Sequence, residues 1–202
     1  IVPVGLVNPR IDGGPPKYLD WASARQVRPE NGGGAMNSGA PVVTSMRIGY
    51  DLSNLYLLMQ FAPQAVATTD LKIEVHLMSP RGSSLLVIRR DDDHMTASIE
   101  PTGPMKWAMR ETVQVQLPFE TLRARRGDTV RFTVVVLGEE RLMSAIPSRG
   151  VMSIDLPGVG ESGHPLRSIA LGSRRSSVSN AHASGRGRVA GGRPPCILPS
   201  PA

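Results

Sequence analysis

The stretch that decides the fold is Leu71-Lys-Ile-Glu-Val-His-Leu-Met78, in which apolar and polar side chains alternate from Leu71 to Leu77. In an extended strand successive side chains point to opposite faces, so the apolar members would share one face and the polar members the other. Residues 129–137 begin in the same way, but their second half is apolar on both faces. We therefore predict two half-buried strands, and we expect another segment to cover the second half of 129–137.

Alternating or apolar runs recur between residues 42 and 157, separated by turn-forming Asp, Asn, Gly, Pro and Ser. The spacing leaves no room for crossover helices, so it favours an antiparallel β-sandwich or barrel. Short helices are predicted only at residues 119–125 and 18–25. The predicted strands, nine in number, are 43–50, 55–61, 71–78, 84–90, 94–99, 112–117, 129–137, 141–146 and 151–156.

The net charge of +6 is concentrated at the end of the chain. Residues 158–202 hold six arginines and one acid, Glu161, and so carry +5, which leaves +1 for residues 1–157. The tail is rich in Gly, Ser, Arg and Pro and has no aromatic residue, a composition typical of disordered chain. We expect a β-sandwich over 1–157, a disordered tail over 158–202, native or out-of-frame, and little affinity for nucleic acid. A polyanion-binding arm is the alternative interpretation of the tail.

Several classes of protein are excluded or disfavoured by what the sequence lacks. No stretch approaches the roughly 20 apolar residues of a membrane-spanning helix. The single cysteine, Cys196, excludes a disulfide framework and a cysteine-based zinc site. The chain starts at Ile1 with no signal or transit pattern, so we expect a cytoplasmic fragment of a longer protein.

Catalytic and metal-binding patterns are also missing. Glu111 and Glu120 are single acids with no partner for acid/base work, and the four histidines lack metal-ligand spacing. His76 is expected on a solvated strand face. Asp91-Asp-Asp93 offers oxygens for calcium, although hairpin tips often carry acids for solubility alone. We expect no catalytic residue, metal or cofactor, with calcium as the open alternative.

Six segments follow one another in a suggestive order: NPRIDGG (8–14), YLDWASA (18–24), GGGAMNSG (32–39), MRIGYDLSNLYL (46–57), ETVQVQLPFETL (111–122) and IPSRGVM (146–152). This series resembles the C-terminal β-sandwich that follows the catalytic domain in many glycoside hydrolase family 57 proteins. The similarity spans roughly residues 7–157 and is absent from the tail.

The resemblance implies the sandwich shared by glucodextranase C-terminal domains, family 9 carbohydrate-binding modules and DOMON-type domains. It implies a non-catalytic accessory domain that packs on the catalytic domain of the same parent chain, and α-glucan as a possible ligand. The catalytic carboxylates of that family lie in the upstream barrel, outside the matching segments. No membrane partner is expected.

Trp21 and Trp107 are the candidate sugar-binding residues, because family 9 modules clamp a sugar between two tryptophans and indoles stack on sugar C–H faces. Asp20 adjoins Trp21 and would bind a hydroxyl. The competing interpretation has Trp21 plug the end of the sandwich core, whereas Trp107, at a strand start, is equally suited to burial or exposure. We expect the three tyrosines to be half-buried strand aromatics.

A second function remains open at this point. Nine methionines and the histidines His76 and His94 on predicted strands also suit a DOMON-type domain that binds haem or another small ligand.

Overall fold

The computed structural model describes residues 3–28, 42–63, 70–92 and 94–158. Contacts divide the chain into a unit over Ile1–Arg167 and a second unit over Ser168–Ala202. The second unit and, except for Gly158, the predicted tail lie outside the described residues. The fold below is that of the first unit.

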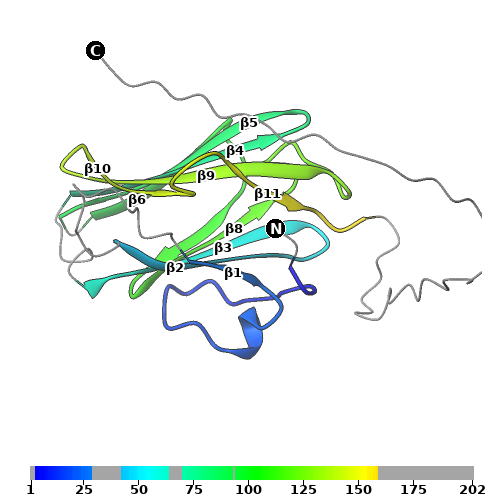
Figure 1. Cartoon of the computed structure of the whole chain (residues 1–202), viewed down its shortest axis with the longest axis horizontal. Helices are drawn as coiled ribbons and strands as arrows, with labels where there is room; N and C mark the ends of the chain where they lie inside the picture. Colours follow the sequence, from blue (N-terminus) through cyan, green and yellow to red (C-terminus); the bar gives the residue numbers. More distant parts are fainter. Residues whose placement is uncertain (1–2, 29–41, 64–69, 93, 159–202) are drawn as a thin grey trace, which may run out of the picture. The chain divides into compact units, whose positions relative to one another are not determined.

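The described residues form two antiparallel sheets packed face to face (Figure 1). Sheet A has the strand order β1 (Arg25–Val27), β2 (Val43–Tyr50), β3 (Asn54–Phe61), β8 (Thr112–Pro118), β7 (Lys106–Met109). Sheet B has the order β10 (Arg141–Ile146), β9 (Thr129–Gly138), β4 (Asp70–Ser79), β5 (Gly82–Asp91), β6 (His94–Glu100), with β11 (Met152–Asp155) also on β9. This confirms the predicted all-β sandwich, and each of the predicted strands is present.

A single apolar cluster fills the space between the sheets. Leu57 and Val115 contribute from sheet A, and Val75 and Phe132 from sheet B, each with at most 2% of its surface exposed. The alternation of 71–78 and 129–137 therefore buries the side chains that the sequence predicts. Burying such side chains contributes roughly 1.5–3 kcal/mol each, which makes this cluster the main stabilising element.

Strand β9 organises sheet B because three strands pair with it. Strand β4 pairs with one edge of β9 along most of its length. On the other edge of β9, β10 pairs with residues 134–138 and β11 with residues 129–132. Two short strands thus lie end to end beside one long strand, and they protect its backbone polar groups.

The sequence missed two strands and overestimated two helices. Strands β1 and β7 are only three and four residues long, too short for a recognisable alternation. The helix predicted at 119–125 is wrong: Arg123 has a φ of 50°, a left-handed conformation that ends a helical run, and the segment consists of turns. The helix predicted at 18–25 reduces to a 3-10 helix at Leu19–Trp21.

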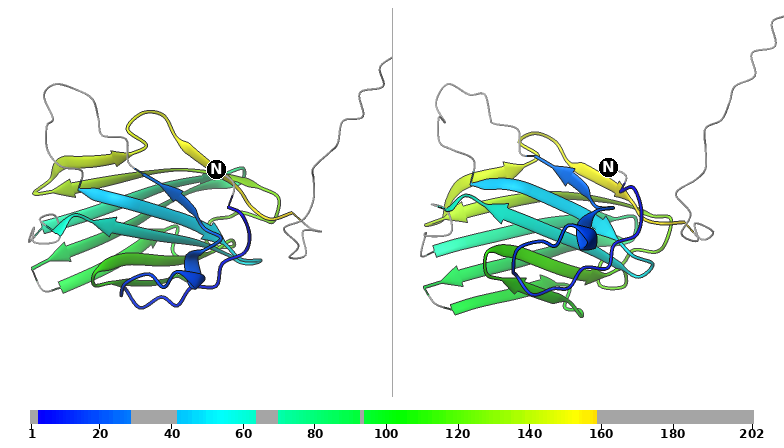
Figure 2. Two further views of the ribbon diagram at one scale, coloured as in Figure 1. Left: turned by 60° about the horizontal axis from the view of Figure 1, so that its bottom comes forward. Right: turned by 90° about the horizontal axis from the view of Figure 1, so that it is seen from below.

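The outer face of sheet A is covered by the N-terminal segment, residues 3–24, as Figure 2 shows in blue against the cyan strands. Trp21 and Val7 of this segment pack on Tyr56 and Leu58 of β3, and these four buried side chains form a second apolar cluster. Strand β3 is therefore buried on both faces. The covering segment is a third layer over the sandwich.

The outer face of sheet B differs from this. We expected a segment over the second half of 129–137, yet Val135 and Leu137 remain half-buried, and Figure 1 shows no described strand or helix beyond the outer face of β9. For the described residues that prediction is wrong, because the only covering segment goes to sheet A.

The turn between β2 and β3 is closed by the carboxylate of Asp51. It accepts hydrogen bonds from the backbone N–H groups of Ser53 and Asn54, both at 2.6 Å, and from the Tyr56 hydroxyl at 2.7 Å. Burial acts to raise the pKa of Asp51, but these donors outweigh it and hold the pKa below its ordinary value. The pKa of the Tyr56 hydroxyl is raised strongly. Burial is the largest cause, and the hydrogen bond to Asp51 is the second.

We predict that the two faces of β3 are equally sensitive to truncation. Leu57 points into the main core and Leu58 lies under the N-terminal segment, and both are fully buried. Either leucine replaced by alanine should lower the free energy of unfolding in urea by about 2–5 kcal/mol. Leu142→Ala, at a side chain that is 64% exposed, should change it by at most about 0.5 kcal/mol. A Leu58 variant as stable as the Leu142 variant would show that sheet A is not covered.

A second prediction concerns acid stability. Since folding lowers the pKa of Asp51, its contribution is complete above its unfolded pKa and is lost as pH falls through the folded pKa. Tyr56→Phe removes one donor, so it should cost about 1 kcal/mol at pH 7 and less below about pH 4. Urea unfolding between those values tests this. In an Asp51→Asn background the cost should no longer depend on pH, and a persistent dependence would contradict the assignment.

Candidate functional site

A small crevice lies on the outer side of sheet A, between the N-terminal segment and β8. Its enclosed volume is about 10 Å³, enough for one water molecule. Its lining consists of two acids, two cations, two prolines, an amide and an indole: Asp12, Asp20, Arg10, Lys17, Pro15, Pro16, Gln114 and Trp21. We call this the outer-face crevice.

The side chain of Gln114 forms one wall of the crevice and holds the loop at residues 12–14. Its Oε1 accepts the backbone N–H of Asp12 at 3.1 Å and of Gly13 at 3.3 Å. Its Nε2 donates to the carbonyl of Gly14 at 2.9 Å and to the hydroxyl of Thr112 at 3.1 Å. Gln114 is 1% exposed, so its amide is both buried and fully paired.

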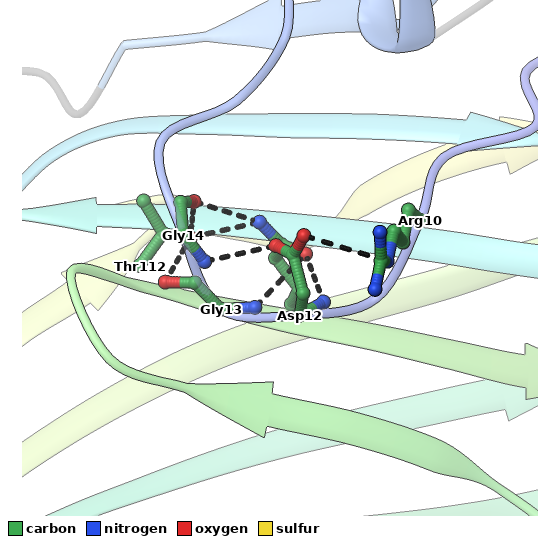
Figure 3. A network of polar contacts seen from close by, with 6 residues as sticks. Arg10, Asp12, Gly13, Gly14 and Thr112 are labelled. Carbon is green, nitrogen blue, oxygen red and sulfur yellow. Dashed lines mark hydrogen bonds and ion pairs between the residues drawn. The ribbon is translucent and has the colours of Figure 1, made fainter.

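Backbone contacts reinforce this attachment, as Figure 3 shows around Asp12, Gly13 and Gly14. The N–H of Thr112 donates to the carbonyl of Gly13 at 3.0 Å, and the Thr112 hydroxyl lies 3.0 Å from the carbonyl of Gly14. The Asp12 carboxylate accepts the N–H of Gly14 at 3.0 Å, and Arg10 approaches it from solvent at 3.8 Å. These bonds hold the loop at residues 12–14 in place as one wall of the crevice.

Gly13 is required at its position for two reasons. Its φ is +71°, and a Cβ would lie 2.9 Å from the backbone nitrogen of Arg110. The first makes any L side chain strained, and the second leaves no room for one.

Trp21 forms the floor of the crevice and is only 2% exposed. It does not plug the end of the main core, since its neighbours Val7, Tyr56 and Leu58 belong to the second cluster. Because so little of its surface is exposed, Trp21 offers almost no surface to a ligand. Asp20, the neighbouring candidate, is partly exposed on the lining.

The structure does not bring Trp107 to Trp21. Trp107 lies on β7 opposite Val115 of β8 and packs against the main core, so it is on the inner face of sheet A. Trp21 lies beyond the outer face of the same sheet. A clamp that uses both indoles is not formed, because the sheet itself separates them.

The structure corrects our expectation for the tyrosines. Tyr50 and Tyr56 are buried, with 7% and 2% of their surface exposed. Tyr18 is on no strand: it precedes the 3-10 helix and is 77% exposed. It follows Lys17 and stands two residues before Asp20, both of which line the crevice. The expectation of a half-buried strand position is therefore wrong for Tyr18, and its place in a Pro-rich, non-alternating segment was the available signal.

The histidines and acids proposed for haem or calcium do not converge. His76 faces outward from β4 beside Glu74, and His94 starts β6 opposite Asp91, at the far end of the same sheet. Asp91 and Asp92 lie at the β5–β6 turn, whereas Asp93 lies outside the described residues. In the described part of the chain no three His, Cys, Asp or Glu residues gather as a metal site, and no helix is long and apolar enough to cross a membrane.

A larger open pocket of about 320 Å³ lies where the β6–β7 connection meets the turns after β8. It is lined by Pro101, Thr102, Gly103, Pro104, Glu120, Thr121 and Arg123. It has one acid, one cation and no aromatic residue, so it offers fewer specific contacts than the outer-face crevice.

A comparison with known family models, curated proteins and solved structures finds no match to this chain.

We predict that Gly13 and Gly127 respond differently to alanine. Both have positive φ, but a Cβ at Gly127 meets nothing within 4 Å. Gly127→Ala should cost about 1–2 kcal/mol of unfolding free energy, from the backbone alone. Gly13→Ala should cost about 1–3 kcal/mol more, because the 12–14 loop must move off β8. Equal losses in urea unfolding would contradict the close contact.

Proposed function

We propose that this chain is a non-catalytic accessory domain of a family 57-like, α-glucan-active protein, and that it holds a neutral sugar chain at the outer-face crevice. The motif order in the sequence supports the family. Residues from two of the matching segments, 8–14 and 18–24, line the crevice together, so these two motifs of the resemblance meet at one place on the surface.

The charge balance of the crevice carries the proposal. Arg10 and Lys17 supply donors, Asp12 and Asp20 supply acceptors, and their formal charges cancel. A charged ligand would need a site of net opposite charge, whereas a ligand with many hydroxyls needs donors and acceptors side by side. This arrangement therefore suits a neutral polyhydroxylated ligand.

The ligand rests at the mouth of the crevice, since the enclosed space holds only a water molecule. The exposed ring of Tyr18 offers the apolar surface on which a sugar stacks its C–H groups. Trp21 acts as the rigid floor and Asp20 as a hydroxyl acceptor. Trp107 has no part in this site, because it lies on the inner face of sheet A.

The accessory role follows from the same resemblance. The domain would pack on the catalytic domain of its parent chain and keep a glucan near it, with no chemical step of its own. The parent's reaction, hydrolysis or transfer, would belong to that catalytic domain.

Titration of the chain with maltooligosaccharides, followed by tryptophan fluorescence, tests the binding. Trp107→Phe should leave the affinity unchanged and assign the signal to Trp21. Tyr18→Ala should weaken binding about tenfold, equivalent to about 1.4 kcal/mol, and Asp20→Asn should weaken it several-fold. The matched control Tyr18→Phe should keep most of the affinity, since stacking needs the ring and not the hydroxyl.

Loss of binding in Trp107→Phe but not in Tyr18→Ala would place the ligand elsewhere. No fluorescence change and no retention on starch or glycogen would remove the sugar-binding part of the proposal.

A further inference from the structure

The outer face of sheet B presents aliphatic side chains around a charged centre. Its central strand, β4, exposes Lys72, Glu74 and His76 in succession. Antiparallel register places Val87 and Val135 on the two sides of Glu74. The same register flanks these residues with further apolar side chains: Leu85 beside His76, Leu137 beside Lys72, and Leu142 and Ala145 on β10.

This face is the counterpart of the one that the N-terminal segment covers. On sheet A the outward apolar side chains Tyr56 and Leu58 are buried beneath that segment. On sheet B the outward side chains Val87, Val135 and Leu137 are half-buried and carry no described covering element, and Leu142 is 64% exposed. An apolar sheet face of this extent is typical of an interaction surface.

The charges at the centre show a complementary pattern. Glu74 binds Lys72 through one oxygen at 2.6 Å and His76 through the other at 3.4 Å. Arg89 lies beside Lys72 in the register and makes no ion pair with any described residue. The two neighbouring cations, Lys72 and Arg89, therefore lie two residues from the acid Glu74 along the strand direction.

We propose that this face binds a second copy of the same chain, with the two β4 strands antiparallel and face to face. A two-fold axis perpendicular to β4, placed between Lys72 and Glu74, sets each Lys72 against the Glu74 of the other copy. A two-fold axis along β4 would instead set Lys72 against Lys72, which is repulsive. The charge pattern therefore selects the antiparallel arrangement.

The neighbouring strands agree with this axis. In the antiparallel arrangement the outward residues of β9 meet those of the other copy's β9, so that Leu137 faces Val135. On β10, Leu142 faces Ala145, and on β5, Arg89 comes close to the other copy's Glu74. The apolar pairs flank the ionic centre, and sheets stacked in this way pack about 10 Å apart.

The size of the face indicates a weak dimer. The five strands are six to ten residues long and about 4.8 Å apart, so at about 3.3 Å per residue the face covers roughly 700 Å². Stable interfaces bury about 800 Å² on each partner. Because the face is somewhat smaller than a standard interface, we expect a concentration-dependent equilibrium between monomer and dimer.

Sedimentation equilibrium of the chain between about 1 μM and 1 mM tests the association, and charge reversal tests the arrangement. Lys72→Glu gives a copy with two acids at the centre, and Glu74→Lys gives one with two cations. Each variant alone should dimerise at least tenfold more weakly than the unchanged chain. An equimolar mixture should form a heterodimer, which also shows that both variants are folded.

Val135→Asp should abolish the dimer, since it places an unpaired acid against Leu137. The matched control is Leu19→Asp, which changes an apolar side chain that is 84% exposed on the other side of the sandwich, and it should leave the Kd unchanged. The inference is overturned if the chain stays monomeric at 1 mM, if the mixture forms no heterodimer, or if Leu19→Asp is the variant that breaks the dimer. This test uses no sugar, so it is independent of the proposed function.

Discussion

The structure depends on one constraint: strand β3 is apolar on both faces. Leu55, Leu57 and Met59 point into the space between the sheets, while Tyr56 and Leu58 point the other way. A sandwich of two sheets can bury only the first set, so sheet A needs a further layer, and residues 3–24 supply it. Gln114 and Thr112, which pair in register with β3, then meet the backbone of that layer and not water. The outer-face crevice is the gap that remains where this layer turns.

The fold was largely predictable because period-two alternation is strong in the strands that face the main core. The third layer was not, because the segment that forms it has no periodicity, and part of its attachment consists of backbone groups bonded to the Gln114 amide. Gln114 alternates with apolar residues in 112–117, a pattern typical of a strand with one solvated face, and only the apolar run from Leu55 to Met59 indicates that this face is covered. Asp20 and Trp21 are neighbours in the chain and both line the crevice, whereas the position of Trp107 depends on which face of β7 turns inward. Exposure of Tyr18 depends on how the predicted helix at 18–25 shortens to a 3-10 turn at Leu19–Trp21.

Residues in the motifs of the family resemblance have identifiable structural roles. Gly13 permits the close approach of the 12–14 loop to β8, Asp51 closes a hairpin, and Phe119 and Leu122 fill the main core. These residues shape the protein and would not themselves contact a ligand. The resemblance therefore bears more directly on architecture than on binding, and the proposal for sugar rests on the composition of the crevice.

The attachment of the N-terminal segment has a consequence for how the chain is made. The bonds from Asp12 and Gly13 to Gln114 join residues that are 102 and 101 positions apart. During synthesis the segment emerges before the strands that it covers, and its binding surface is incomplete until β8 has left the ribosome. Residues 3–24 therefore stay undocked, with Trp21 and Val7 in solvent, while most of the domain is still being translated. Within this domain, a segment translated before β8 is among the last to reach its place, so a chaperone that shields apolar segments would act on this layer.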